Sequence, residues 1–132
     1  MREGIFISII GTIGSLLVLL FGGWSTALIT LIIFMGIDYL TGLLVAGLFK
    51  SSKKSETGAL ESKAGWKGLC RKGMILLIVL IAYQLDVKDA VIIAFIANET
   101  ISIIENAGLM GVPVPQIIMG AIDILIKKDE EL

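Results

Sequence analysis

A long uncharged stretch near the start of the chain limits what this sequence can fold into. From Gly4 to Ile37 there is no Asp, Glu, Lys or Arg. One helix that crosses the hydrocarbon of a bilayer needs about 20 apolar residues, so this stretch has room for nearly two crossings. The whole chain is 56% hydrophobic and 17% charged, with a mean hydropathy of +0.95, unlike a water-soluble domain. We therefore expect an integral membrane protein.

Turn-forming and polar segments divide the chain into four apolar runs. The segment FGGWST at 21–26 combines two glycines, an interfacial Trp and helix-capping hydroxyls, which predicts a tight turn. The predicted spans are about 5–21, 27–49, 73–88 and 90–107. Because the uncharged stretch is barely long enough for two full crossings, three spans remain an alternative, with the first two runs fused or one of those two peripheral. The expected fold class is all-α, a single membrane domain over 1–132 with three to four transmembrane helices.

A basic segment separates the second and third runs, and we expect a polar loop at 50–72. It carries two acidic and seven basic residues, namely Lys50, Lys53, Lys54, Lys63, Lys67, Arg71 and Lys72. Short loops rich in Lys and Arg stay in the cytoplasm and attract anionic lipid, so this loop is predicted at the cytoplasmic membrane surface. Counting crossings from it places both termini in the cytoplasm. With a net charge of −1 overall, we expect no nucleic-acid partner.

The C-terminal tail, 113–132, has the pattern of an amphipathic helix. One helical face carries Ile117, Ile118, Ala121, Ile122 and Leu125, and the other carries Gln116, Gly120, Asp123 and Lys127. Such a helix lies on the membrane surface or packs onto a neighbouring helix.

The residue types that most enzymes and metal sites use are scarce. The chain has no His and one Cys, so neither an internal disulfide nor a His/Cys metal cluster can form. No nucleophile–base pair or phosphate-binding loop is recognisable. We expect no enzymatic activity, no catalytic or metal-binding residue and no cofactor.

Small and polar residues inside the second run form a candidate contact surface. Asp38, Gly42 and Ala46 follow one another at helical i+4 spacing, and a carboxylate inside a membrane span is costly unless it has a partner. Gly11 and Ser15 repeat the small-xxx-small spacing in the first run. Small residues let membrane helices approach closely, although each is also compatible with ordinary internal packing.

The fourth run carries a second polar face. Asn98, Ser102 and Asn106 follow one another at i+4 steps, and Glu99 and Glu105 flank them. A polar face on a membrane helix must contact another helix or water, so these five residues are candidates for lining a pore or contacting another subunit. Alternatively, Glu99 pairs with Arg71 or Lys72 inside one subunit, and Asn106 caps the end of its helix.

Several of these segments together resemble a known family. DYLTGLLVA in the second run, SSKKS and GWKGLCRK in the basic segment, LLIVLIAYQLD, and above all NETISIIENAGLMGVPVP are similar to the phage lysis and toxin-secretion holins. This family includes the Cp-1-type holins and the clostridial toxin-export holins. The resemblance covers about 38–125 and implies a protein of the bacterial cytoplasmic membrane that oligomerises into lesions. Through these lesions an endolysin, or a toxin, leaves the cell.

The resemblance also implies the partners of the chain. They are other copies of itself, with the endolysin or toxin passing through without stable binding. Anionic lipid is a further expected partner, because of the basic loop. No catalytic residue is established in the family, so none is carried over. A small ion channel or transporter, and a regulatory membrane protein of the antiholin type, remain alternative functions.

Overall fold

The computed structural model describes residues 1–131, and these fold into helices joined by turns and loops. Leu132, the last residue of the predicted tail, lies outside the described residues. The described helices are α1 (Arg2–Phe21), α2 (Thr26–Gly47), α3 (Ser62–Gln84), α4 (Lys88–Leu109) and α5 (Gln116–Glu130). The expected all-α class is therefore confirmed.

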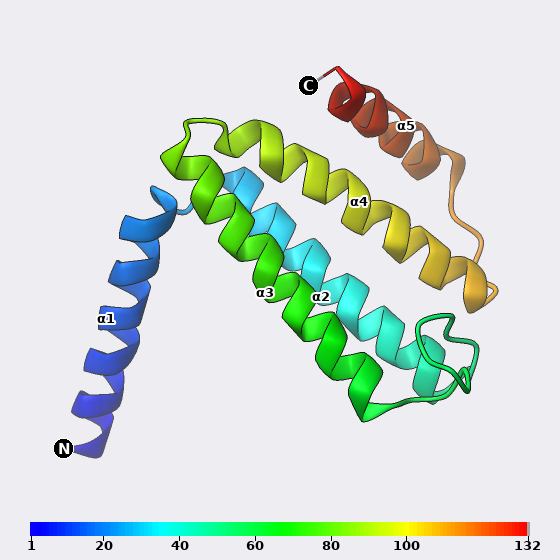
Figure 1. The fold of residues 1–132 in the computed structure, drawn as a ribbon, viewed down its shortest axis with the longest axis horizontal. Coiled ribbons are helices and arrows are strands. Elements are labelled where there is room, and N and C mark those ends of the chain that lie inside the picture. The colour runs from blue at the N-terminus through cyan, green and yellow to red at the C-terminus, as the bar shows by residue number, and fades with distance from the viewer. Residues whose placement is uncertain (132) are drawn as a thin grey trace.

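Helices α2, α3 and α4 form a bundle, as Figure 1 shows. Helices α2 and α4 run in the same direction and α3 runs against both, while α5 turns back along α4. Helix α1 leans away from the bundle. The turns at 22–25 and 85–87 lie at one end of the bundle, called here the turn end, and the segments 48–61 and 110–115 lie at the other, called the loop end.

The apolar core fills the half of the bundle next to the turn end. It consists of side chains that are at most 8% exposed, from α2 (Leu28, Leu31, Met35), α3 (Val79) and α4 (Ile92, Ile96). In lipid these contacts stabilise the bundle by close packing, because lipid tails are as apolar as the side chains. In the half next to the loop end, Val45 and Ala46 are also buried, and polar contacts add to this packing.

Three described helices, α1, α2 and α4, are long and apolar enough to cross a membrane. Helix α1 has the highest hydropathy of the three, and none of its residues is buried. Helix α3 has comparable length, but its first half carries Lys63, Lys67 and Arg71. This result supports a membrane location for the chain.

The basic segment departs from the expected loop. Helix α3 begins at Ser62, so 62–72 is helical and only 48–61 is a turn and loop segment. One reason is Tyr39 of α2, whose hydroxyl donates to the Gly65 carbonyl at 3.3 Å. A Cβ on Gly68 would lie 3.5 Å from the Tyr39 ring, so the small residues let this part of α3 pack on α2. The third predicted span, 73–88, corresponds to the second half of α3 and the turn after it.

The turn predicted at 21–26 is present, and it joins α1 to the rest of the protein. The Ser25 hydroxyl accepts a hydrogen bond from the Leu28 N–H at 3.1 Å and caps α2. Gly22 is left-handed at φ 74° and lies against the Tyr83 ring. Lys88 donates to the Phe21 carbonyl, and its ammonium lies 5.6 Å from the centre of the Tyr83 ring. These contacts fix the last turn of α1 and leave the rest of the helix free.

Replacing Gly22 by Ala tests this junction, and Gly23→Ala is its matched control. Both glycines have positive φ, so each substitution costs about 1–2 kcal/mol from the left-handed backbone. Only at Gly22 would the new Cβ collide with the Tyr83 ring, since nothing lies within 4 Å of a Cβ at Gly23. We expect Gly22→Ala to lower the thermal stability in detergent, and to raise protease cleavage at 22–25, more than the control does. Equal effects of the two substitutions would show that the Tyr83 contact does not hold α1.

Candidate functional site: a buried charge cluster

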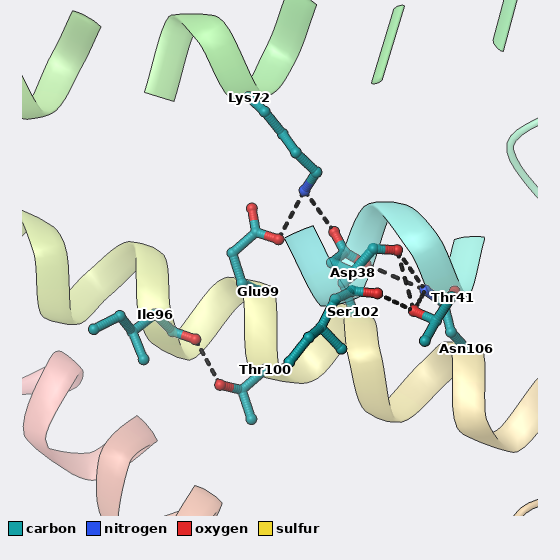
Figure 2. Close-up of polar contacts among 9 residues, drawn as sticks. Asp38, Thr41, Lys72, Ile96, Glu99, Thr100, Ser102 and Asn106 are labelled. Atoms are coloured by element: carbon teal, nitrogen blue, oxygen red, sulfur yellow. Dashed lines mark hydrogen bonds and ion pairs between the residues drawn. The ribbon is translucent and has the colours of Figure 1, made fainter. Parts of the chain in front are cut away.

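Three helices each contribute one charged side chain to a cluster in the half of the bundle next to the loop end. Lys72 of α3 places its ammonium nitrogen 2.8 Å from Asp38 Oδ2 of α2 and 2.8 Å from Glu99 Oε2 of α4. Figure 2 shows the lysine reaching between the two carboxylates. The side chains of Lys72, Asp38 and Glu99 are 16%, 6% and 3% exposed. The cluster thus links α2, α3 and α4.

Neutral side chains extend the cluster along α2 and α4. The Ser102 hydroxyl donates to Asp38 Oδ1 at 2.6 Å. The Asn106 amide nitrogen lies 3.2 Å from Asp38 Oδ1, 3.3 Å from the Asp38 carbonyl and 2.9 Å from the Thr41 hydroxyl oxygen (Figure 2). Both oxygens of Asp38 therefore accept hydrogen bonds. Asp38 therefore connects the ion pair with Lys72 to the hydrogen bonds with Ser102 and Asn106.

The charges in this cluster do not balance. Two carboxylates share one ammonium, and no other ion pair forms within residues 1–131. Taking a charge out of water costs several kcal/mol, and only close pairing and hydrogen bonds compensate for that cost. Lys72 therefore stabilises both carboxylates at once, which makes it the residue whose loss would cost most.

The cluster's polar atoms bind mainly to one another. No group of three or more potential metal-binding side chains comes together within the part of the chain that the structure describes. The Lys72 ammonium, both Asp38 carboxylate oxygens and Glu99 Oε2 already have partners within the protein, as Figure 2 shows. In the structure the cluster links α2, α3 and α4.

The structure divides the predicted polar face of α4 into an inner and an outer part. Glu99, Ser102 and Asn106 turn inward to Lys72 and Asp38, so the alternative in which Glu99 pairs with Lys72 inside one subunit is confirmed. The alternative in which Asn106 caps its helix is wrong, because the side chain bonds to α2. Asn98 and Glu105 lie outside the cluster and are exposed.

The predicted α2 face points inward along its whole length. A Cβ on Gly42 would lie 3.9 Å from the Asn106 amide nitrogen, and Ala46 is 7% exposed. These small residues let α2 and α4 lie close enough for Asp38 to reach Ser102 and Asn106. Whether this face, or that of α4, lines a pore or contacts another subunit stays a prediction.

Of the seven basic residues, Lys72 is placed differently from expectation. The other six, Lys50, Lys53, Lys54, Lys63, Lys67 and Arg71, are exposed, whereas Lys72 lies within the cluster and not at the surface. The sequence does contain a signal for this position. Lys72, Leu76 and Val79 follow at helical i, i+4, i+7 spacing, which puts the lysine on the core-facing side of α3. Thr41, one helical turn after Asp38, was also missed.

Comparison with known proteins places the chain in a family. The sequence model of the Bacteriophage holin family matches residues 15–127, which include every residue of the cluster. The chain belongs to the bacteriophage holin family. Membership of this family indicates a non-enzymatic membrane protein, in agreement with the three apolar helices.

Individual relatives cover most of the chain. A Clostridium perfringens (strain 13 / Type A) protein, named only as uncharacterized, is 35% identical over 96% of this chain and 97% of its own length. An uncharacterized Listeria innocua protein is 39% identical over 85% of this chain and 81% of its own. A protein of Bacillus phage phi105 named "Probable holin" is 30% identical over 72% of this chain and 70% of its own. No solved structure gives a significant match.

Replacing Lys72 by Met tests the energetic role of the cluster. The substitution keeps most of the side-chain volume but leaves two buried carboxylates without a cation, which costs about 3–5 kcal/mol. We expect a large loss of thermal stability in detergent and of accumulated protein in membranes. Lys67→Met is the control, because Lys67 is exposed on the same helix and forms no ion pair within residues 1–131.

A second variant separates lost charge balance from lost packing. Adding Asp38→Asn and Glu99→Gln to Lys72→Met removes the unpaired charges, so we expect it to restore part of the stability. If Lys72→Met is as stable as Lys67→Met, the cluster does not hold the three helices together.

Proposed function

We propose that this chain acts as a holin that accumulates in the bacterial cytoplasmic membrane and then assembles into lesions that release an endolysin. Family membership and the similarity to the phage phi105 protein support a holin role. The observation that carries the proposal is the buried polar network on α2 and α4. Helices that line water need polar side chains. In this chain such side chains lie between α2 and α4, because exposing them to lipid would be costly.

In the proposed mechanism the polar side chains have two environments. In a single subunit they face one another and Lys72, so the inserted protein leaves the bilayer intact. In the lesion, α2 and α4 separate from α3 and turn the same side chains toward water. Hydrogen bonds between membrane helices contribute about 0.6–2 kcal/mol each, so a few of them can hold the closed arrangement without making it permanent.

Accumulation would supply the trigger. Contacts between copies stabilise the open arrangement more as the concentration of copies in the membrane rises, as for any equilibrium linked to association. The opening would then be abrupt once the concentration in the membrane passes a threshold. Endolysin, or a toxin in a toxin-export role, would cross the lesion without binding to it stably.

The exposed basic residues support a proposed orientation in the membrane. Lys50, Lys53 and Lys54 lie in the loop-end segment, and Lys63 and Lys67 in the first turns of α3 beside it. Lys and Arg near the end of a membrane-spanning helix favour the cytoplasmic side. There each contributes about 1 kcal/mol by attraction to anionic lipid. The loop end would therefore be cytoplasmic and the turn end would face outward, with the N-terminus of α1 on the cytoplasmic side.

Inducible expression in a bacterial host, with a cytoplasmic endolysin co-expressed, tests the proposed function. We expect a lag, abrupt loss of membrane potential, appearance of endolysin activity outside the membrane, and lysis. Expression of the endolysin alone is the control and should leave the cells intact.

Two other results would each contradict the proposal. Loss of potential without passage of the endolysin would indicate a small ion channel or transporter. Normal growth at high membrane levels of the protein would indicate an antiholin-type regulatory role.

A further inference from the structure

A cavity of about 200 Å³ lies beside the charge cluster, and the loop-end segment 48–61 forms part of its wall. Further wall residues come from α2, from the first half of α3 and from α4. Ser55 of the loop-end segment lines the cavity, and its hydroxyl oxygen is buried without a hydrogen-bond partner within residues 1–131. Buried polar atoms nearly always have a partner, so this hydroxyl indicates a bound group in the cavity.

The charged side chains of the cavity that lack a partner are both cations. Arg71 and Lys54 line it, and neither side chain forms a hydrogen bond or an ion pair within residues 1–131. The acidic side chains of the wall all accept a contact from the protein, namely Asp38, Glu61 and Glu99. The cavity therefore has two cations left for an anionic group.

Arg71 lies at a depth where an unpaired charge is costly. It directly precedes Lys72, which contacts Asp38, nine residues before the end of α2 at Gly47. At 1.5 Å per residue this is about 14 Å inside a helix that is long and apolar enough to cross a membrane. A guanidinium at such a depth pairs with a counter-charge or extends toward the headgroups. Lys72 already occupies both carboxylates nearby, so Arg71 requires another anion.

Phosphate is the anion that these groups fit. The guanidinium of Arg71 has a planar fork of N–H donors that matches two phosphate oxygens, and an ammonium or a hydroxyl donates to one more. Arg71 is exposed and lines the cavity, so the cavity opens beside it. Phospholipids already hold phosphate at the membrane surface, within reach of a long side chain, whereas free phosphate would have to leave water.

From these observations we propose that the cavity binds the phosphate of one phospholipid from the leaflet at the loop end. Arg71 binds two phosphate oxygens, and Lys54 and Ser55 donate to the others. The bound lipid then joins the loop-end segment to α3 and strengthens the closed arrangement of the subunit. The site rests on the proposed function only in that the chain is inserted in a membrane.

Native mass spectrometry of the full chain tests the site, with phosphatidylglycerol titrated into the detergent micelles. We expect one lipid per chain to stay bound after the micelle is removed. Arg71→Gln should weaken this binding about tenfold and Ser55→Ala about fivefold, because each removes a hydrogen bond to a charged group. Arg71→Lys, which keeps the charge without the fork, should lie between Arg71→Gln and the unchanged chain.

Each substitution has a matched control outside the cavity. Lys67→Gln removes a cation from α3 one helical turn before Arg71, and Ser51→Ala removes a hydroxyl from the loop-end segment. Neither Lys67 nor Ser51 lines the cavity, so both controls should retain the lipid. Equal losses in a variant and its control would overturn the proposal and leave only a general attraction of basic residues for anionic lipid. If Arg71→Gln does not fold, the two serine variants decide the question.

Two further ligands identify the source of the phosphate. Diacylglycerol with the same acyl chains lacks the phosphate and should bind far more weakly. Equal retention of diacylglycerol would mean that only the acyl chains are recognised, which overturns the proposal. Inorganic phosphate at millimolar concentration should not displace the lipid, and displacement would mean that the cavity takes free phosphate instead.

Thermal unfolding in detergent gives a second measure, because a ligand that binds only the folded chain stabilises it. Phosphatidylglycerol should raise the melting temperature of the unchanged chain and of Ser51→Ala more than that of Ser55→Ala. An equal rise in all three would contradict the site. Lysis by a chain that retains no lipid would refute the site alone, and lipid retention without lysis would refute the proposed function alone.

Discussion

The contact of Lys72 with Asp38 and Glu99 is the interaction on which the rest of the structure depends. In a bilayer there is no expulsion of water to hold helices together, so packing and polar contacts must do so. Here an apolar core packs the half next to the turn end, and the charge cluster links the three helices near their middle. Because one lysine pairs with two carboxylates, any movement of α3 away from α2 and α4 leaves both carboxylates without their cation.

The same arrangement leaves most of α1 and two polar side chains of α4 exposed. The inner side chains of α4 are used up in holding α2 and α3, whereas Asn98 and Glu105 are left outside. Helix α1 is fixed only at its last turn and exposes the rest of its length. The charged side chains are therefore paired inside the subunit, whereas α1 is exposed along most of its length.

The sequence alone predicted the helices and the polar residues inside them, but not which polar residues pair with one another. Hydropathy and turn chemistry located α1, α2 and α4 closely, because bilayer thickness and glycine geometry are local constraints. The helical start of α3 was missed because its support is the distant Tyr39. Asp38 and Glu99 were recognisable as costly charges, but the choice of Lys72 over Arg71 as partner depends on the rotation of α3, which only packing determines.

The central claim is that the polar side chains of α2 and α4 are hidden in the single subunit and reach water in the lesion. The most direct test uses cells that express the protein with Cys70→Ser and Ser102→Cys. A thiol reagent that does not cross membranes is added outside the cells. The account predicts no labelling before loss of the membrane potential and rapid labelling after it, while Val79→Cys in the apolar core, 0% exposed, stays protected. Equal labelling before and after, or protection of Ser102→Cys throughout lysis, would contradict the account.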